Sequence, residues 1–269
     1  MLSPVSNLKH WTRVWLSGTR ASLVREMEFR GNFIAGLIRQ LIWVSIFVLM
    51  VEVMFSNTNQ LAGWDHAEVL LLLALSRIIE GLMNALFINN LMHLPEIVQQ
   101  GKFDFHLVKP LPVQFYTSLR SANINQTANI VAGVFLLFYA STAAHISLFT
   151  VSWLWLGFLA IAGMIIYYSL LIIAASLVFV LERLEFLWGF NMIISEPLTV
   201  PFDIFPSGAR VSLTYLLPLA FIVYVPAQAV TGRLTGQTII LAFFIAAITL
   251  TLANLAWRAG LRRYSSASS

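Results

Sequence analysis

The sequence predicts an all-α membrane protein with six transmembrane helices, an N-terminal amphipathic interfacial helix and a re-entrant helical segment between spans five and six. Its 269 residues are 59% hydrophobic and only 10% charged, whereas about 25% of the residues in a soluble domain are charged. Stretches of about 20 apolar residues, the length that crosses a bilayer, recur along the chain. This composition argues against a soluble enzyme and a disordered regulator. The absence of cysteine excludes disulfides and thiol nucleophiles.

Six stretches are apolar enough to span the membrane. They are Phe33–Met54, Glu68–Asn90, Ser121–Ala140, Trp153–Leu181, Leu187–Phe205 and Gly236–Trp257. Pro197 and Pro201 break the fifth stretch. Residues 206–234 are also apolar, but proline and glycine cut them into short pieces, which predicts two half-helices that enter the membrane and turn back. Residues 1–32 form the lead before this transmembrane domain (33–257), and residues 258–269 form a tail.

The cations indicate the orientation, because Lys and Arg in short loops concentrate on the cytosolic side. Five precede the first span, three lie between spans two and three, one lies between spans four and five, and three follow span six. The opposite side has only Arg210 and Arg233. Both termini and the loop 91–120 are therefore predicted to be cytosolic. A seventh span through residues 206–234 would place the three C-terminal arginines outside, against this rule.

The lead before the first span has an amphipathic pattern. Leu8, Trp11, Trp15 and Leu16 share one face of a helix, and the cations lie elsewhere on it. Such a helix suits the cytosolic headgroup layer, where tryptophan anchors and cations meet anionic lipid. The alternative is a lead-in that only sets the topology.

The loop 91–120 is the largest cytosolic insertion. Pro95 and Glu96 suit the start of a short helix, and Gly101 suits its end. Beyond it the loop is expected to display Phe103, Phe105 and Leu107 to the cytosol. Docking of a partner and lying flat on the membrane explain this display equally well.

Polar residues inside the spans are candidate pathway residues. Arg77 and Glu80 are three positions apart, so they share a helix face and can pair as a functional or a structural ion pair. Glu196 precedes Pro197, which interrupts the backbone hydrogen bonds of the helix. The interruption is either part of a gate or only a kink. Span three has a polar stripe, which either lines a transport pathway or forms hydrogen bonds with a neighbouring helix. Its members are Asn123, Gln126, Asn129 and Gly133.

No motif for catalysis is present in the sequence. The only Gly-Lys pair, at Gly101–Lys102, lacks the upstream glycine and the hydroxyl of a P-loop. The five histidines are dispersed, so no metal-binding spacing occurs. The sequence therefore predicts a non-enzymatic protein with no metal site and no catalytic residue.

Two short motifs are the most specific parts of a wider pattern. They are Gly-x-Phe-Asp-x-x-x-x-Lys-Pro at Gly101–Pro110 and Tyr-Val-Pro-Ala at Tyr224–Ala227. The wider pattern covers Arg25–Phe33, Asn90–Pro110, Gln114–Arg120 and Pro201–Leu234. With the basic lead, the six spans and the re-entrant segment, these stretches resemble ABC-2-type permeases. The resemblance is closest to the bacterial ABC-2 family transporter permeases of uncharacterised transport systems, and it covers nearly the whole chain.

The resemblance assigns roles to two segments. The residues around Leu94–Pro110 look like the coupling helix that sits in a groove of a separate ATPase, and residues 205–234 look like an outer gate. The implied coupling residues are Pro95, Glu96, Gly101, Lys102, Phe103, Asp104, Lys109 and Pro110, with a second contact at Glu182, Arg183 and Glu185. The implied gate residues are Pro206, Pro218, Tyr224 and Pro226.

The resemblance also implies partners and a location. An ABC-2 permease is usually part of an exporter, in which two identical or related permease chains pair in the bacterial cytoplasmic membrane. ATP and Mg would bind to the ATPase subunits, and this chain would contact lipids but no nucleic acid. The alternative is an ATP-independent channel or secondary carrier, and a third possibility is an assembly subunit without a pathway.

Overall fold

The computed structural model describes residues 4–28, 30–147, 150–181 and 186–264, and the regular structure of these residues is helical apart from one small hairpin. The long helices are α1 (Pro4–Glu28), α2 (Arg30–Phe55), α3 (His66–Met83), α8 (Thr127–Ala143), α9 (Val151–Leu181) and α13 (Gly236–Leu261). The shorter elements are β1 (Gln60–Leu61), β2 (Trp64–Asp65), α4 (Asn89–Met92), α5 (Leu94–Gln99), α6 (Asp104–Leu107), α7 (Val113–Ser118), α10 (Phe186–Ser195), α11 (Ser207–Val211) and α12 (Tyr224–Val230).

The predicted class, an all-α membrane protein, is confirmed. Among the described residues, five helical segments are long and apolar enough to cross a membrane. They are Phe33–Phe55, His66–Gln99, Ile124–Ala143, Val151–Val180 and Gly236–Leu261. A sixth arises only if Ser207–Leu216 and Leu219–Val230, which bend by 70° at their junction, are counted as one span.

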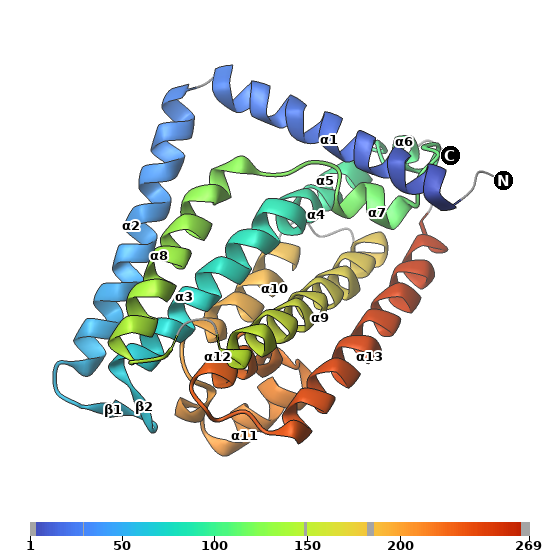
Figure 1. Cartoon of the computed structure of the whole chain (residues 1–269). Helices are drawn as coiled ribbons and strands as arrows, with labels where there is room; N and C mark the ends of the chain where they lie inside the picture. Colours follow the sequence, from blue (N-terminus) through green and yellow to red (C-terminus); the bar gives the residue numbers. More distant parts are fainter. Residues whose placement is uncertain (1–3, 29, 148–149, 182–185, 265–269) are drawn as a thin grey trace.

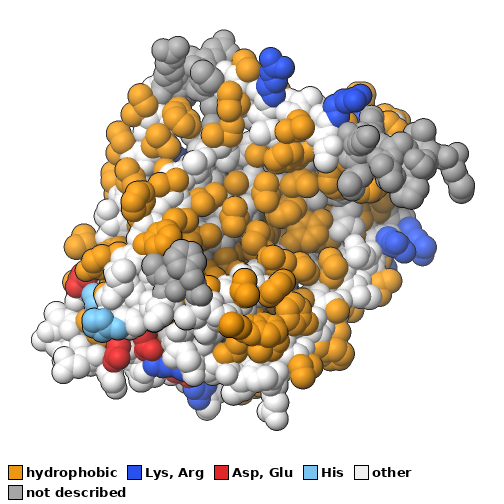
Figure 2. Space-filling model, viewed as in Figure 1, with side chains coloured by type: hydrophobic (Ala, Val, Ile, Leu, Met, Phe, Trp, Pro, Cys, Tyr) orange, Lys and Arg blue, Asp and Glu red, His pale blue; other side chains and the backbone are white. Residues whose placement is uncertain are grey.

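The two ends of the molecule differ in what they carry. Both termini and α5 to α7 lie together, and we call this the loop end (Figure 1). The β1–β2 hairpin and α11 lie at the opposite end, which we call the hairpin end (Figure 1). Apolar side chains cover the surface between the two ends, and Lys and Arg lie near its margins (Figure 2). The apolar band is the surface expected to contact lipid.

Two buried helices, α3 and α9, organise the packing. α2 and α8 pack on α3, whereas α10, α12 and α13 pack on α9. Glycines allow the closest approaches, as is common between helices in membranes. A Cβ at Gly133 of α8 would lie 3.1 Å from the carbonyl oxygen of Ala74. A Cβ at Gly260 of α13 would lie 2.5 Å from the carbonyl oxygen of Ser176.

The predicted fifth span is not one continuous helix. α10 has 10 residues and ends at Ser195, and 3-10 turns follow at Glu196–Thr199 and Phe202–Ile204. The physical reason is that Pro197 and Pro201 cannot donate the backbone hydrogen bonds that would continue the helix. Ten residues of helix cover about 15 Å, half the hydrocarbon thickness.

The segment after α10 contains the predicted break. Leu219–Phe221 forms a buried 3-10 turn at the bend. A Cβ at Gly163 of α9 would lie 2.5 Å from the carbonyl oxygen of Ile222, so only glycine permits this contact. Irregular backbone is tolerated at membrane depth when protein covers it in this way.

The lead helix α1 packs on the loop end. The Trp11 ring stacks on Phe115 with centroids 5.1 Å apart, and the Ala122 amide donates to Thr19 Oγ1 at 3.2 Å. Leu16 is exposed. The predicted apolar face is therefore divided, because Trp11 packs on protein while Leu16 remains available to the membrane surface.

Candidate functional site

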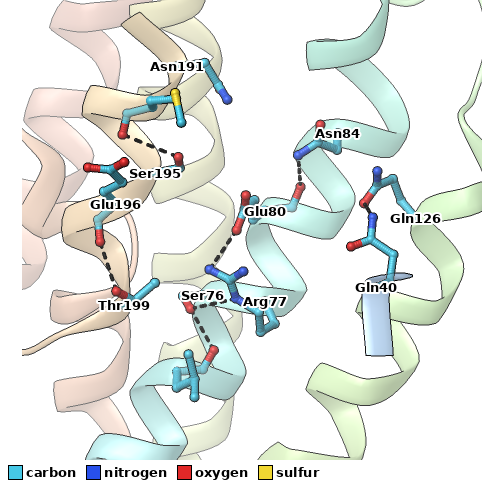
Figure 3. Close-up of polar contacts among 12 residues, drawn as sticks. Gln40, Ser76, Arg77, Glu80, Asn84, Gln126, Asn191, Ser195, Glu196 and Thr199 are labelled. Atoms are coloured by element: carbon cyan, nitrogen blue, oxygen red, sulfur yellow. Dashed lines mark hydrogen bonds and ion pairs between the residues drawn. The ribbon is translucent and has the colours of Figure 1, made fainter. Parts of the chain in front are cut away.

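A cavity of about 610 Å³ lies among α2, α3, α8 and α10, and most of the residues that line it have polar side chains. It brings together the candidate pathway residues of three predicted spans. They are Arg77, Glu80, Gln126, Asn129 and Glu196. Figure 3 shows Arg77 and Glu80 on α3, with Gln40 and Gln126 to one side and the residues after Asn191 to the other. We call this space the polar cavity.

The predicted ion pair on α3 is formed. Arg77 Nη2 lies 2.8 Å from Glu80 Oε2, and the guanidinium carbon lies 4.5 Å from the centre of the Phe47 ring. Arg77 is only 6% exposed. Glu80 and the ring therefore compensate the buried charge of Arg77, which a charge at this depth requires.

The polar stripe of span three serves two purposes. Gln40 Nε2 donates to Gln126 Oε1 at 3.1 Å across the cavity wall. Gly133 packs against α3, as the helix-packing alternative expects. Asn123 does not line the cavity; its side chain accepts from the Asn125 amide at 3.2 Å. The stripe is thus divided: Gln126 and Asn129 line the cavity, whereas Gly133 packs against α3.

Asn129 is the unusual member of the stripe. It is 4% exposed, and its Oδ1 atom has no hydrogen-bond partner among the described residues. A buried amide oxygen without a donor costs free energy, so such atoms usually meet water or a ligand. Asn129 therefore marks the part of the cavity wall that has an unused acceptor.

The loop 91–120 contains the expected short helix. α5 begins at Leu94, Pro95 is buried in its first turn, and Glu96 is exposed and accepts from Gln100 Nε2 at 2.8 Å. Gly101 has a φ of 67°, which suits a turn that only glycine adopts easily. The predicted helix start and stop are thus confirmed.

One expectation for this loop is wrong. Phe103 is not displayed but buried, and its ring lies 5.0 Å from the rings of both Phe179 and Tyr264. Tyr264 also donates to Asp104 Oδ1 at 3.1 Å. The Gly-Lys-Phe-Asp turn therefore anchors the loop to α9 and to the end of α13, which the local sequence pattern does not reveal.

Phe105 and Leu107 are displayed as predicted, and Val108, which was not predicted, is displayed with them. Phe105 is 68% exposed, Val108 is 77% exposed, and Leu107 is exposed as well. These three residues, which we call the loop tip, lie between two exposed lysines, Lys102 and Lys109, and are followed by exposed Pro110. The predicted second contact, Glu182, Arg183 and Glu185, lies outside the described residues.

His106 ties the loop tip to α7. It is buried, and its Nδ1 lies 3.2 Å from Thr117 Oγ1. Burial, together with the nearby positive charges of Arg120 and Lys109, lowers the pKa of His106 from 6.5 to about 4. The fold therefore holds the neutral ring.

Acidification is expected to loosen this loop. Because the folded pKa is lowered, the contribution of His106 to stability is complete above about pH 6.5 and is lost as the pH falls toward 4. Hydrogen exchange of residues 103–118, corrected for its intrinsic pH dependence, should show less protection at pH 5 than at pH 7. The His106→Leu variant should show no such difference, and an equal loss in this variant would contradict the assignment.

At the hairpin end, an acidic residue that was not among the predicted site residues holds residues 205–234, which we call the outer segment, in place. Asp203 Oδ2 accepts from Trp64 Nε1 at 3.0 Å and from the Tyr224 hydroxyl at 2.6 Å, and Arg210 Nη1 lies 3.2 Å from Oδ1. Trp64 is fully buried. A signal was present, since Asp203 is the only acidic residue after Glu196.

A second contact fixes the hairpin. Arg233 Nη2 lies 2.6 Å from Glu68 Oε2, and the guanidinium carbon lies 4.4 Å from the centre of the Trp64 ring. Of the implied gate residues, Tyr224 joins the Asp203 contact, Pro218 and Pro226 are buried at the bend and in α12, and Pro206 is exposed before α11. The hairpin and the outer segment thus form one closed unit.

Comparison with known families gives one match. A model of the family described as "ABC-2 family transporter protein" matches residues 41–268. No curated protein and no solved structure matches the chain. The match includes the loop tip, the Asp203 contact and the residues that line the polar cavity apart from Arg39 and Gln40. Since it covers far more than half of the chain, the chain belongs to the ABC-2 transporter family, the membrane permeases of ABC transport systems.

Proposed function

We propose that this chain is the permease subunit of an ATP-driven exporter in the bacterial cytoplasmic membrane, with both termini in the cytosol. Two permease chains, identical or related, would form the pathway, and separate ATPase subunits would bind ATP and Mg. The observation that carries the proposal is the loop tip. Its apolar residues project between two lysines at the end that holds both termini, where a water-soluble partner can reach them.

The loop is built to transmit a displacement. Phe103 packs against Phe179 of α9, and Tyr264 beyond α13 donates to Asp104, so a push on the tip acts on two membrane helices. Asn90 fixes the end of the loop, where the chain runs back toward α8. Its Nδ2 donates to the carbonyl oxygens of Ser118 at 3.2 Å and Ser121 at 2.8 Å. A rigid connection of this kind favours a coupling role over a loop that lies flat on the membrane.

α9 connects the loop end with the outer segment. Its 31 residues extend about 46 Å. Near the loop end it carries Phe179, and farther along it carries Gly163, which contacts the backbone of Ile222 at the bend. ATP-driven closure of the ATPases would therefore move the outer segment relative to the hairpin, between a state in which Asp203 is bonded to Trp64 and one in which this contact is open. Transport requires that ATP binding shift the balance between two such states.

The proposal is tested by purifying the tagged full chain from its native cells and reconstituting it. We expect an ABC ATPase to co-purify and its ATP turnover in vesicles to depend on the permease. Lys109→Glu should lower this turnover, whereas Gln237→Glu, at an exposed position near the start of α13, should not. Transport by the chain alone, with no ATPase bound, would support the channel or carrier alternative instead.

A further inference from the structure

We infer that the polar cavity binds the zwitterionic headgroup of an amphipathic molecule whose apolar tail stays in the bilayer. As a statement about transported cargo, this inference rests on the proposed function. As a statement about binding, it concerns only this chain and can be tested without an ATPase.

The charges of the cavity wall point to a ligand with both signs. Four ionisable residues line the cavity, two cations and two anions, and Arg77 and Glu80 neutralise each other. The remaining two, Arg39 and Glu196, form no ion pair with a described residue. A phosphate near Arg39 and an ammonium near Glu196 would compensate both, whereas an anionic headgroup would leave Glu196 without a partner.

Asn129 supplies a further polar group in the cavity wall. Asn129 is more than nine-tenths buried, and its Oδ1 lacks a donor among the described residues. An ammonium or hydroxyl group of a headgroup can donate to it. The volume of about 610 Å³ lies within the usual range for small-molecule sites, so it can hold a headgroup of moderate size.

The rim of the cavity suits an apolar tail. Trp43 on α2 and Trp188 and Met192 on α10 line it, and each of these side chains is about half exposed. Arg39 lies in the first half of α2 and Gln126 lies directly before α8, which places these two residues in the half of the bundle nearer the loop end. A lipid of that leaflet can therefore insert its headgroup sideways while its chains rest on these aromatic side chains.

The test is native mass spectrometry of the detergent-solubilised full chain with phosphatidylethanolamine and phosphatidylglycerol of matched acyl chains. We expect tighter binding of the zwitterionic lipid. Asn129→Leu should weaken that binding about fivefold, the effect of losing one ordinary hydrogen bond. Asn254→Leu removes an amide from α13, outside the cavity, and should leave the binding unchanged.

Glu196→Gln separates charge recognition from a structural effect. Because Glu196 is exposed, the substitution should not disturb folding. It should shift the preference toward the anionic lipid. The inference is overturned if the wild type shows no lipid preference, if Asn129→Leu and Asn254→Leu behave alike, or if glycerophosphoethanolamine, which has no acyl chains, competes as well as the lipid.

The outcome is independent of the test of the proposed function. If the chain binds the zwitterionic lipid but no ATPase, the proposed binding site stands and the proposed exporter is refuted. If the chain stimulates an ATPase but shows no lipid preference, the proposed exporter stands and the proposed binding site is refuted.

Discussion

Phe105→Asp is expected to separate the permease from its ATPase. Phe105 is 68% exposed, so the substitution should leave the fold intact. In the complex, however, the new carboxylate would be buried in an apolar contact. Truncation of a central aromatic residue in an interface typically costs about 2–4 kcal/mol, and a buried unpaired charge adds to this. We expect an affinity at least about a hundredfold lower, measured as ATPase that co-purifies with the tagged chain.

Tyr215→Asp is the matched control for this experiment. Tyr215 is 65% exposed but follows α11, at the hairpin end. The substitution introduces the same charge in place of an equally exposed aromatic ring. ATPase binding should therefore be unchanged. If Phe105→Asp retained the ATPase, the loop tip would not be the docking surface.

Asp203→Ala is expected to cause the largest loss of stability. The substitution removes the acceptor of the fully buried Trp64 indole and of the Tyr224 hydroxyl. Each buried donor left without a partner costs about 1–3 kcal/mol. We therefore expect the free energy of unfolding to fall by about 3 kcal/mol, seen as a lower thermal unfolding midpoint of the purified chain.

Arg210→Ala distinguishes the buried contacts from the exposed ion pair. The side chain of Arg210 is 44% exposed, and an ion pair in such a position contributes little to stability. This variant should unfold within about 0.5 kcal/mol of the wild type. If both variants were equally destabilised, the hydrogen bonds of Trp64 and Tyr224 to Asp203 would not be the cause.

The sequence predicts those features that depend on local composition. Span positions follow from apolar length, and the breaks at Pro197 and Pro218 follow from the chemistry of proline. Five polar residues that line the cavity were also recognisable as candidates, because a charge or amide inside a span is unusual, whereas Arg39 and Gln40 of the first span were not singled out. That Arg77, Asn129 and Glu196 meet in one cavity was not predictable, since it depends on how three helices pack.

Two features required the tertiary structure. Phe103 and Phe105 are two residues apart in one apolar turn, yet one is buried and the other exposed, because α9 and the end of α13 cover only one side of the turn. Trp64 and Asp203 are 139 positions apart in the chain. No local pattern indicates such a pairing, although an isolated acid in an apolar segment suggests that it has a partner.

The most direct test of the coupling claim is a cross-link from the loop tip. The chain contains no cysteine, so Val108→Cys provides a unique thiol at a position that is 77% exposed. A thiol-reactive photo-cross-linker on this residue, activated in native membranes, should capture an ABC ATPase, whereas the same reagent on Tyr215→Cys should not. Capture of the ATPase from neither position, or equally from both, would contradict the account.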